Sequence, residues 1–503
     1  LSFKLHARLK HTMRFLTLLI GILFSLGLQA QDCDCLSNYQ WVKKTFEEND
    51  AGFQYALDRK GVPLYEYHSE AIEAQAKQTK DIVTCQRLLA EWLSFFRAGH
   101  LDIEINLPEG TGVEGERSAE AIIQQFQNWE RLDVDLESFT KYLAQKSEKD
   151  IEGVWETLSK SYRIGIRKVD NAYKGFVMEA NNPYWQPGQV KLTIKQDLSE
   201  GTYYLKDHSA SQLDIINLME EDYLQLGTVM MQRVGATEPS AAIAQYMNNI
   251  GEGSPYFAEV DDQTLLIGIP SFDYDYKEEI DELIEAHRTQ ILSTPNLIID
   301  IRGNGGGSDA SFKELIPFLY TSPIRSVGIE LRSTPRNNER MLTIANDDEY
   351  DEEIQEWAKQ AYDVLNEHLG EFVNIYGQEV FVSTFDTVLP YPQHVGILID
   401  EENGSTAEEF LLIAKQSQKV KLFGRTTFGV LDISNMYWAD APSGDFTLHY
   451  SLSKSFRLSG MAIDGIGIQP DIFLDQTLPR HEWLNYVQEV LHQEGATAPT
   501  LNR

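Results

Sequence analysis

The spacing of hydrophobic residues changes along the chain, and each change predicts a different kind of structure. From about residue 36 to 98 the apolar positions have helical spacing, most clearly over 82–96. Segments 164–169, 173–178 and 189–194 instead alternate apolar and polar residues, as the strands of a half-buried sheet do. The first part of the chain is therefore expected to be helical, and the middle part to be rich in strands.

The last part of the chain combines short apolar runs with amphipathic segments. The runs at 264–269, 297–301 and 395–400 are typical of buried strands, and segments 278–293 and 407–417 have helical spacing. Strands that alternate with helices favour crossover connections and a largely parallel sheet with helices on its faces. This part is therefore predicted to be an α/β core.

These patterns divide the chain into five expected parts. They are a signal peptide region over 1–30, an N-terminal helical domain over 31–107, a middle helical and β-rich domain over 108–254, the α/β core over 255–475, and a C-terminal helix and tail over 476–503. Residues 13–30 have a short basic start, an apolar stretch and a small-residue exit, as secretory signals do. The apolar stretch is shorter than the roughly 20 residues of a spanning helix. We therefore expect export to the periplasm or the cell exterior, with no stable membrane insertion after cleavage.

Charge and cysteine content narrow the expected partners. The chain has 77 acidic and 43 basic residues and a formal net charge of −34, which repels phosphates and argues against a nucleic-acid partner. An oxidising compartment would permit one disulfide among Cys33, Cys35 and Cys85, and the sequence leaves the pairing open. Two cysteines one residue apart make a poor zinc site without further ligands, so no metal is expected.

Candidate chemistry begins where the apolar run 395–400 ends. The next residues, Gly404-Ser405-Thr406, precede a predicted helix, so Ser405 would present its hydroxyl and the following amide at a helix N-terminus. That position suits a nucleophile. A serine there is also a common helix cap without chemistry, so Ser405 alone does not establish a catalytic site.

A second turn of the same kind follows the run 297–301. Its glycines, from Gly303 to Gly307, would let the backbone approach a substrate carbonyl and direct N–H groups at a developing oxyanion. Ligands of open α/β sheets bind beyond the carboxyl ends of the strands, where both turns are expected. The glycine run lacks the Gly-Lys-Ser/Thr ending of a P-loop and the order of glycines of a dinucleotide-binding turn.

The motifs together resemble those of the C-terminal-processing and tricorn-core group of serine peptidases. The resemblance spans roughly 255–475 and is carried by Asp300-x-Arg302-x-Asn304-x-Gly306-Gly307, Ser405-x-x-Glu408, Thr427-Phe428-Gly429 and the closing segment from Asp464 to Asp471. It implies a ClpP/crotonase-like core in which Ser405 is the nucleophile. It also implies that the middle domain stands where many relatives carry a PDZ domain, although no PDZ-like loop is recognisable here.

One departure from the group's pattern concerns the general base. Many members use a serine–lysine dyad, with the lysine directly after Thr-Phe-Gly, but that position is Val430 here. A valine cannot accept a proton. The tricorn-type and retinoid-binding-protein-like branch draws a histidine from the region before the core, and His100 fits that pattern. Asp464 then corresponds, as a shorter carboxylate, to the acidic residue that orients the base.

The resemblance gives each candidate residue a role. Ser405 would be the nucleophile, His100 the base and Asp464 the orienting carboxylate, and the oxyanion hole would use Thr406 with Gly306 or Gly307. The leading hypothesis is a secreted serine peptidase that cleaves peptides or unfolded protein chains without a cofactor. Two alternatives stay open: a non-catalytic ligand- or peptide-binding protein on the same fold, and a serine esterase.

Overall fold

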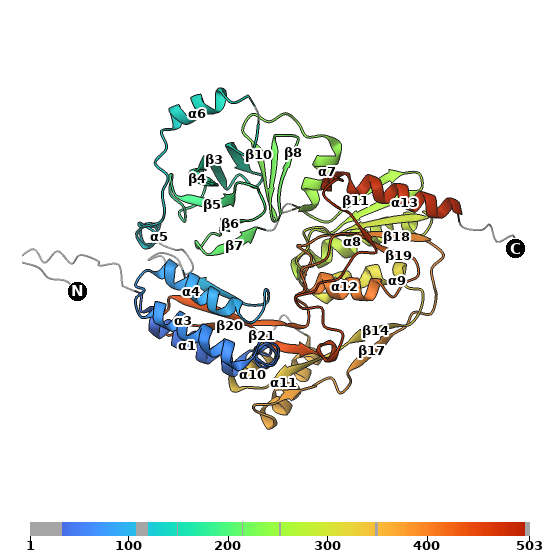
Figure 1. Ribbon diagram of the computed structural model, residues 1–503. Helices are drawn as coiled ribbons and strands as arrows, with labels where there is room; N and C mark the ends of the chain where they lie inside the picture. The colour runs from blue at the N-terminus through green and yellow to red at the C-terminus, as the bar shows by residue number, and fades with distance from the viewer. Residues whose placement is uncertain are drawn as a thin grey trace, which may run out of the picture.

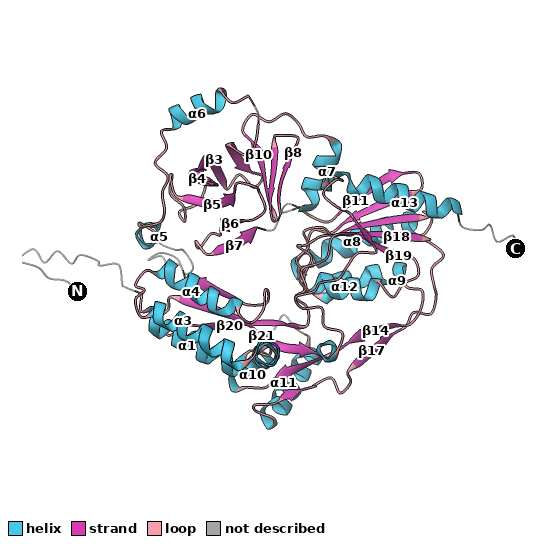
Figure 2. Ribbon diagram, viewed as in Figure 1, coloured by secondary structure: helices cyan, strands magenta, loops and turns pink. Residues whose placement is uncertain are grey.

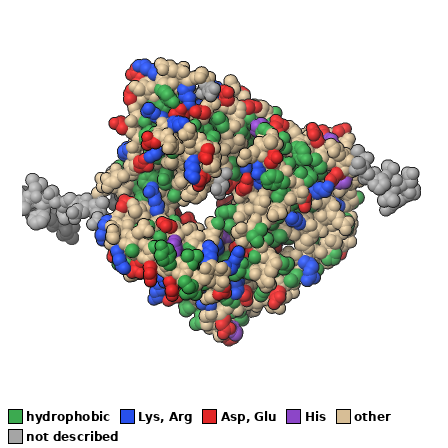
Figure 3. Space-filling view, in the orientation of Figure 1, with side chains coloured by type: hydrophobic (Ala, Val, Ile, Leu, Met, Phe, Trp, Pro, Cys, Tyr) green, Lys and Arg blue, Asp and Glu red, His purple; other side chains and the backbone are tan. Residues whose placement is uncertain are grey.

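A computed structural model of the chain describes residues 33–106, 119–147, 149–213, 215–250, 253–347 and 351–497. Three lobes surround a central hollow, as Figures 1 and 3 show from one side. The predicted signal region, 1–30, lies outside the described residues. Within the ranges above, every helix is too short or too polar to cross a membrane. The predicted mixed α/β fold, with a helical N-terminal region and several sheets, is confirmed.

The lobe on the right of Figure 1 is built on a six-stranded sheet. Its strands, in spatial order, are β11 (Tyr256–Asp261), β12 (Thr264–Gly268), β13 (Asn296–Asp300), β18 (His394–Ile399), β19 (Val420–Gly424) and β22 (Ile472–Phe473). All neighbours are parallel except β11 and β12. The ends of β13 and β18 therefore lie side by side at one edge, and both glycine-containing turns leave the sheet there.

Alternate side chains of these strands enter two separate cores. Ile299 and Ile397 pack on one face against α8 (Lys277–Ile291) and α12 (Thr406–Ala414), whereas Leu398 packs on the other face against α13 (Trp483–Thr497). The segment after the glycine turn is not one continuous α-helix. It is a 3-10 helix, η2 (Asp309–Leu315), followed by the short α9 (Ile316–Leu319), because Pro317 lacks the N–H that a continuous α-helix would use.

The upper lobe is a single nine-stranded antiparallel sheet (Figure 2). In chain order its strands are β2 (Gly153–Thr157), β3 (Tyr162–Val169), β4 (Ala172–Ala180), β5 (Val190–Lys195), β6 (Gly201–Tyr204), β7 (Ala210–Leu213), β8 (Ile216–Met219), β9 (Tyr223–Leu226) and β10 (Val229–Arg233). Side chains from both ends of the sheet share one core, including Leu213 of β7 and Leu226 of β9. The sheet therefore curls around its own interior.

Three helices flank the nine-stranded sheet: α5 (Ala119–Gln125), α6 (Leu136–Ala144) and α7 (Ala241–Ile250). The helical part of the predicted middle domain therefore includes the separate helices α5 and α6. Asp135 marks the start of α6, because its carboxylate accepts a hydrogen bond from the Ser138 amide at 3.0 Å and caps the helix.

The third lobe joins the N-terminal helices to strands from distant parts of the chain. The helices are α1 (Cys35–Asn49), α2 (Phe53–Lys60), α3 (Val62–Ala76) and α4 (Ile82–Ser94). They cover a five-stranded sheet of β1 (Asp102–Ile105), β15 (Ile329–Arg332), β16 (Phe372–Val373), β20 (Ile433–Asp440) and β21 (Phe446–Ser455). β21 pairs with β1 along one side and with β20 along the other. Residues that lie more than three hundred positions apart therefore form one core.

Further helices and a short ribbon complete this region. They are α10 (Pro335–Ala345), α11 (Glu352–Glu367) and the pair β14 (Ile324–Val327) and β17 (Val380–Ser383). Met341 of α10 and Leu365 of α11 join the same buried cluster as Trp92 of α4 and Leu448 of β21. The loop between α4 and β1, which contains His100, is thus held between the N-terminal helices and the last strands.

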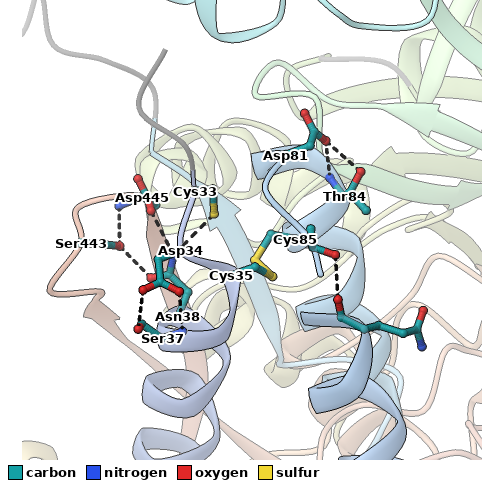
Figure 4. The surroundings of a disulfide bond; sticks show 12 residues. Cys33, Asp34, Cys35, Ser37, Asn38, Asp81, Thr84, Cys85, Ser443 and Asp445 are labelled. Atoms are coloured by element: carbon teal, nitrogen blue, oxygen red, sulfur yellow. Dashed lines mark hydrogen bonds between the residues drawn. A yellow bond between two sulfur atoms is a disulfide. The ribbon is translucent and has the colours of Figure 1, made fainter. Parts of the chain in front are cut away.

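Figure 4 shows the disulfide that the sequence left unassigned. Cys35 at the start of α1 is bonded to Cys85 in α4, and Cys33 is a buried free thiol. The Asn38 side-chain amide donates to the Asp445 carboxylate at 3.0 Å and lies 3.7 Å from the Cys33 sulfur. The start of α1 is therefore fixed both to α4 and to the turn between β20 and β21.

Candidate active site

Ser405 lies at a strained turn between β18 and α12. Its backbone has φ 54° and ψ −122°, a region that non-glycine residues seldom adopt. Although it occupies the N-cap position of α12, its hydroxyl makes no capping hydrogen bond, and the side chain is half-buried. Sharp strand-to-helix turns of this kind present a nucleophilic serine above the sheet. The hydroxyl of Ser405 is therefore available for chemistry.

Glu408, three residues after Ser405, stabilises the turn that contains Ser405. Its fully buried carboxylate accepts hydrogen bonds from the Gly429 amide at 2.8 Å, the Val430 amide at 2.9 Å and the Thr427 hydroxyl. Burial raises the pKa of Glu408, and these hydrogen bonds, with one from the Ser405 amide, oppose the increase. Glu408 therefore makes only its own half of a capping box, and it also fixes the 427–430 loop to the helix that follows Ser405.

The glycine turn after β13 is braced by buried polar side chains. Asp300 and Arg302 form a buried ion pair with a 2.9 Å bond from Nε to Oδ1. The Asn304 side chain donates to the Ile269 carbonyl at 3.0 Å and accepts from the Gly306 amide at 2.9 Å. These residues fix the backbone of the turn from its buried side, so other groups can contact its outer side.

Gly306 places this turn directly against the nucleophile. A Cβ atom at this position would lie 2.9 Å from both the Ser405 Cβ and the Thr406 nitrogen, and the Gly306 backbone has φ 111°. A side chain here would collide with the nucleophile turn. Glycine is therefore required at position 306 by both close approach and backbone conformation.

Two amides near Ser405 are free to receive an oxyanion, and the Gly306 amide is not one of them because it donates to Asn304. The Thr406 amide is the first of α12 and donates to no described group. Gly307 forms a parallel bridge with Phe272, so its own N–H and carbonyl face away from Phe272. That carbonyl accepts the Thr406 hydroxyl at 2.9 Å. The geometry therefore favours Thr406 and Gly307 as the donors.

His100 lies in the loop between α4 and β1, in a left-handed backbone conformation with φ 54°. Its Nδ1 lies 2.7 Å from the Ile433 carbonyl oxygen, so Nδ1 carries the proton and Nε2 has a free lone pair. Burial lowers the pKa of His100, against the Ile433 hydrogen bond, and the positive charge of Arg97 lowers it further. The ring is therefore neutral near pH 7, as a general base must be.

Arg97 fixes the backbone of the histidine loop. Its guanidinium pairs with the fully buried Asp50 carboxylate at 2.6 and 2.8 Å and donates to the carbonyls of Gly99 and His100 at 3.1 and 3.0 Å. Ser451 of β21 donates its hydroxyl to the same His100 carbonyl at 3.1 Å. The position of His100 is thus set by Asp50 just after α1 and by Ser451 of β21, as well as by its own loop.

Asp464 lies next to the histidine site but does not contact the ring. Its two carboxylate oxygens accept the backbone amides of Asp432 at 2.6 Å and Ile433 at 3.2 Å. Burial raises the pKa of Asp464 to about 7. The direct carboxylate–imidazole bond expected from the sequence is therefore replaced in this structure by the Ile433 carbonyl, and Asp464 holds the segment that supplies it.

Sequence reasoning missed two residues of this network, Asp432 and Arg457. The fully buried Asp432 accepts from the amides of Ile463 and Asp464 and from Arg457 Nε at 2.8 Å. Arg457 also binds Glu409 of the nucleophile helix at 3.1 Å. The helix that carries Ser405 is thereby connected to the segment that holds His100. Nothing in the local sequence marks Arg457, because its partners come from other parts of the chain.

Val430, at the position where many relatives were expected to carry a lysine, lies between the loops of Ser405 and His100. Ideal Cβ atoms at Gly99 and Gly404 would lie 2.4 and 2.9 Å from its two methyl groups. The residue before His100 and the residue before Ser405 therefore pack on opposite sides of one side chain. Among the described residues, the Ser405 hydroxyl and the His100 ring form no hydrogen bond with each other. Such bonds are often long in a free enzyme and shorten when substrate binds.

Comparison with known proteins shows which family the α/β core and these turns resemble. Residues 263–474 match peptidase family S41, and this match covers most of the α/β core. No curated protein matches the chain in sequence. A crystal structure of a CPAF mutant is 12% identical, with 91% of this chain and 96% of that chain covered and a TM-score of 0.51. The crystal structure of mature CPAF is 13% identical, with 91% of this chain and 96% of that chain covered and a TM-score of 0.49. The photosystem II D1 C-terminal processing protease is 11% identical, with 91% of this chain and 97% of that chain covered and a TM-score of 0.37.

Proposed function

We propose that the protein is an exported serine peptidase that cleaves peptides or unfolded protein chains through an acyl-enzyme on Ser405. The main support is that a strained serine with a free hydroxyl and a half-buried histidine whose Nδ1 is already occupied each follow a glycine that packs against Val430. The match of residues 263–474 to peptidase family S41 makes a peptide bond the expected target. The expected core is of the ClpP/crotonase type, with the helical and β-rich parts beside it.

The proposed reaction begins with His100. Its Nε2 removes the proton from the Ser405 hydroxyl as the oxygen attacks the substrate carbonyl carbon. The tetrahedral oxyanion receives hydrogen bonds from the amides of Thr406 and Gly307. The imidazolium then protonates the leaving amine as the C–N bond breaks, and water, activated by the same ring, hydrolyses the ester. Val430 takes no part in proton transfer.

The disulfide between Cys35 and Cys85 supports the proposed export. Disulfides form and persist in oxidising compartments and are rare in the cytosol. The same compartment suits a peptidase that acts on peptides or unfolded chains outside the cytoplasm.

A fluorophosphonate probe tests the proposed function directly. The mature chain, its Ser405→Ala variant and its His100→Ala variant would be incubated with the probe and read by intact mass, and then tested on unfolded casein and on an ester substrate. We expect one probe adduct and casein cleavage for the wild type and neither for the variants. A folded wild type that stays unlabelled across a broad pH range would favour a binding protein, and ester cleavage without proteolysis would favour an esterase.

A further inference from the structure

Thr406 connects the nucleophile turn to the glycine turn through its side chain. The residue is buried, and its hydroxyl lies 2.9 Å from the Gly307 carbonyl oxygen and 3.1 Å from the Asp309 carboxylate. Among the described residues, no other group donates a hydrogen bond to the Gly307 carbonyl. The hydroxyl therefore joins the two residues whose amides are the proposed oxyanion donors.

One hydroxyl proton cannot serve both of these acceptors. A threonine hydroxyl has a single O–H donor, whereas the Gly307 carbonyl and an ionised Asp309 carboxylate can only accept. With Asp309 ionised, the carboxylate is the stronger acceptor, so the hydroxyl donates to it and not to Gly307. With Asp309 protonated, the acid donates to the Thr406 oxygen while the Thr406 hydroxyl donates to Gly307. The connection between the two turns is therefore complete only when Asp309 carries a proton.

The surroundings of Asp309 favour its protonated form. Asp309 is the first residue of η2, two positions after Gly307. Desolvation raises the pKa of its carboxyl, although part of the residue is exposed. The Thr406 hydrogen bond and the positive charges of Lys313 and Arg457 oppose the increase without cancelling it. Among the described residues, neither cation forms an ion pair with Asp309.

The charged groups that face Asp309 come from three elements. Lys313 lies on η2 itself, Glu409 on α12, and Arg457 on η3 (Phe456–Ser459). The Arg457 charge is shared between two other carboxylates, Glu409 at 3.1 Å and Asp432 at 2.8 Å. Burial raises the pKa of Glu409, the Arg457 charge opposes this, and the Asp309 charge raises it further. Asp309 and Glu409 therefore disfavour the ionisation of each other.

The choice that the Thr406 hydroxyl makes bears on the transition state. Donors of an oxyanion hole are effective when they are already fixed around the position that the oxyanion will occupy. When the hydroxyl leaves the Gly307 carbonyl, the two donor amides lose the side-chain bond that holds them relative to each other. Bound substrate has no oxyanion, so this loss should lower kcat and change KM little.

We propose that Thr406 and Asp309 are positioning residues of the oxyanion hole, in which the proton on Asp309 keeps the Thr406 hydroxyl on the Gly307 carbonyl. This inference rests on the proposed peptidase function and adds a form of regulation to it. His100 must be neutral to accept a proton, so activity falls at low pH. Asp309 must be protonated, so activity falls again as the pH rises. The pH profile of kcat is therefore bell-shaped, with an alkaline limb that belongs to Asp309.

The Asp309→Asn variant tests the alkaline limb. An asparagine amide is neutral at every pH and can donate to the Thr406 oxygen as the protonated acid does. Above the alkaline midpoint, kcat of this variant on a fluorogenic peptide should be about fivefold to tenfold higher than that of the wild type, the effect of one hydrogen bond. Asp275→Asn is the matched control, since it removes an exposed carboxylate from the neighbouring η1 (Tyr274–Tyr276) and should keep the wild-type profile. The same alkaline limb in Asp309→Asn would overturn the proposal.

Two substitutions of Thr406 test the hydroxyl itself. Thr406→Val keeps the branched shape and removes the donor, so kcat should fall about tenfold with little change in KM, and the alkaline limb should disappear. Thr406→Ser keeps a hydroxyl and should restore both kcat and the limb. A purely structural role would lower the melting temperature of Thr406→Val and leave its alkaline limb in place, which would overturn the proposal.

A measurement without turnover separates this inference from the proposed function. The Ser405→Ala protein would be prepared with ¹⁵N-labelled threonine, and the Thr406 amide signal would be identified by its absence from Ser405→Ala/Thr406→Ser. We expect this signal to shift with pH, with a midpoint above the ordinary aspartate value of about 3.9, and to lose that shift in Ser405→Ala/Asp309→Asn. The same titration in both proteins, or none in either, would overturn the inference even in an active peptidase. A wild type that fluorophosphonate does not label would instead contradict the peptidase function, and the amide titration would still decide the state of Asp309.

Discussion

The two halves of the candidate active site are built in different ways. Ser405 and the glycine turn follow two neighbouring parallel strands, β18 and β13, so one sheet places both of them. His100 instead depends on β1, which is held in place by pairing with β21, and on the Ile433 carbonyl at the start of β20. Ser405 is therefore positioned within the α/β core, and His100 by a separate sheet.

Because of this difference, distant changes in the fold should affect His100 more than Ser405. The nucleophile half is braced by buried groups of its own core, such as Asp300, Arg302 and Glu408. The histidine half needs the N-terminal helices to remain docked on the last strands. Val430 and Arg457 contact both halves, so a displacement of one half should also move residues of the other.

The largest expected effect comes from removing either reacting group. Ser405→Ala and His100→Ala should each lower kcat/KM by about 10⁴-fold or more, because a nucleophile and its general base act as a unit. The double variant should be no worse than either single variant. Steady-state kinetics on a cleaved peptide measures this. Full activity in His100→Ala would show that another group accepts the serine proton.

Removing the disulfide tests how much it stabilises the half of the site that contains His100. It closes a loop with a sequence separation of 50, so Cys35→Ser/Cys85→Ser should lower the free energy of unfolding by about 4 kcal/mol. Cys33→Ser, which removes only the free thiol, is the control and should change far less. Denaturant unfolding followed by tryptophan fluorescence measures both variants. Equal stability of the two variants would show that the bond does not hold this half together.

The glycine turn offers a matched pair of substitutions in the nucleophile half. Gly306→Ala should lower kcat by about 10²- to 10³-fold, the cost of losing an oxyanion donor, because the new methyl group displaces the nucleophile turn. Gly305→Ala should be close to wild type, since no heavy atom lies within 4 Å of its added Cβ. Single-turnover kinetics compares them. Similar activity of the two variants would argue against the close packing of the two turns.

Sequence patterns predicted the nucleophile half more completely than the histidine half. Ser405 and Gly306 lie in motifs whose strand–turn–helix context can be read locally, and the structure forms both turns. The roles of Ile433 and Arg457 could not be read, because a backbone carbonyl has no sequence signal and the partners of Arg457 come from distant segments. Pairing of β1 with β21 was missed for the same reason: periodicity identifies a strand but not its neighbour.

Asp464 should have a smaller effect, because it acts through the main chain. Asp464→Asn keeps the shape of the side chain but replaces one acceptor by a donor that faces an amide, which should loosen the Ile433 carbonyl and lower kcat about tenfold. Asp475→Asn, which changes an exposed aspartate whose carboxylate accepts hydrogen bonds from Thr477, is the control. A positioning role predicts a shifted pH profile as well as a lower kcat. A lower melting temperature with an unchanged pH profile would indicate a structural role only.

The smallest expected effect is a displacement of the pH profile. A general base works only when neutral, so kcat/KM falls as the pH decreases through the pKa of His100. Burial and the charge of Arg97 lower that pKa, so the fall should be centred below the ordinary histidine value of about 6.5. More enzyme is then active at pH 6 than an unperturbed histidine would allow. The rate of fluorophosphonate labelling should follow the same curve, because it depends on the same proton transfer. A midpoint above 6.5 in both measurements would mean that a nearby negative charge, such as ionised Asp464, outweighs burial at the ring.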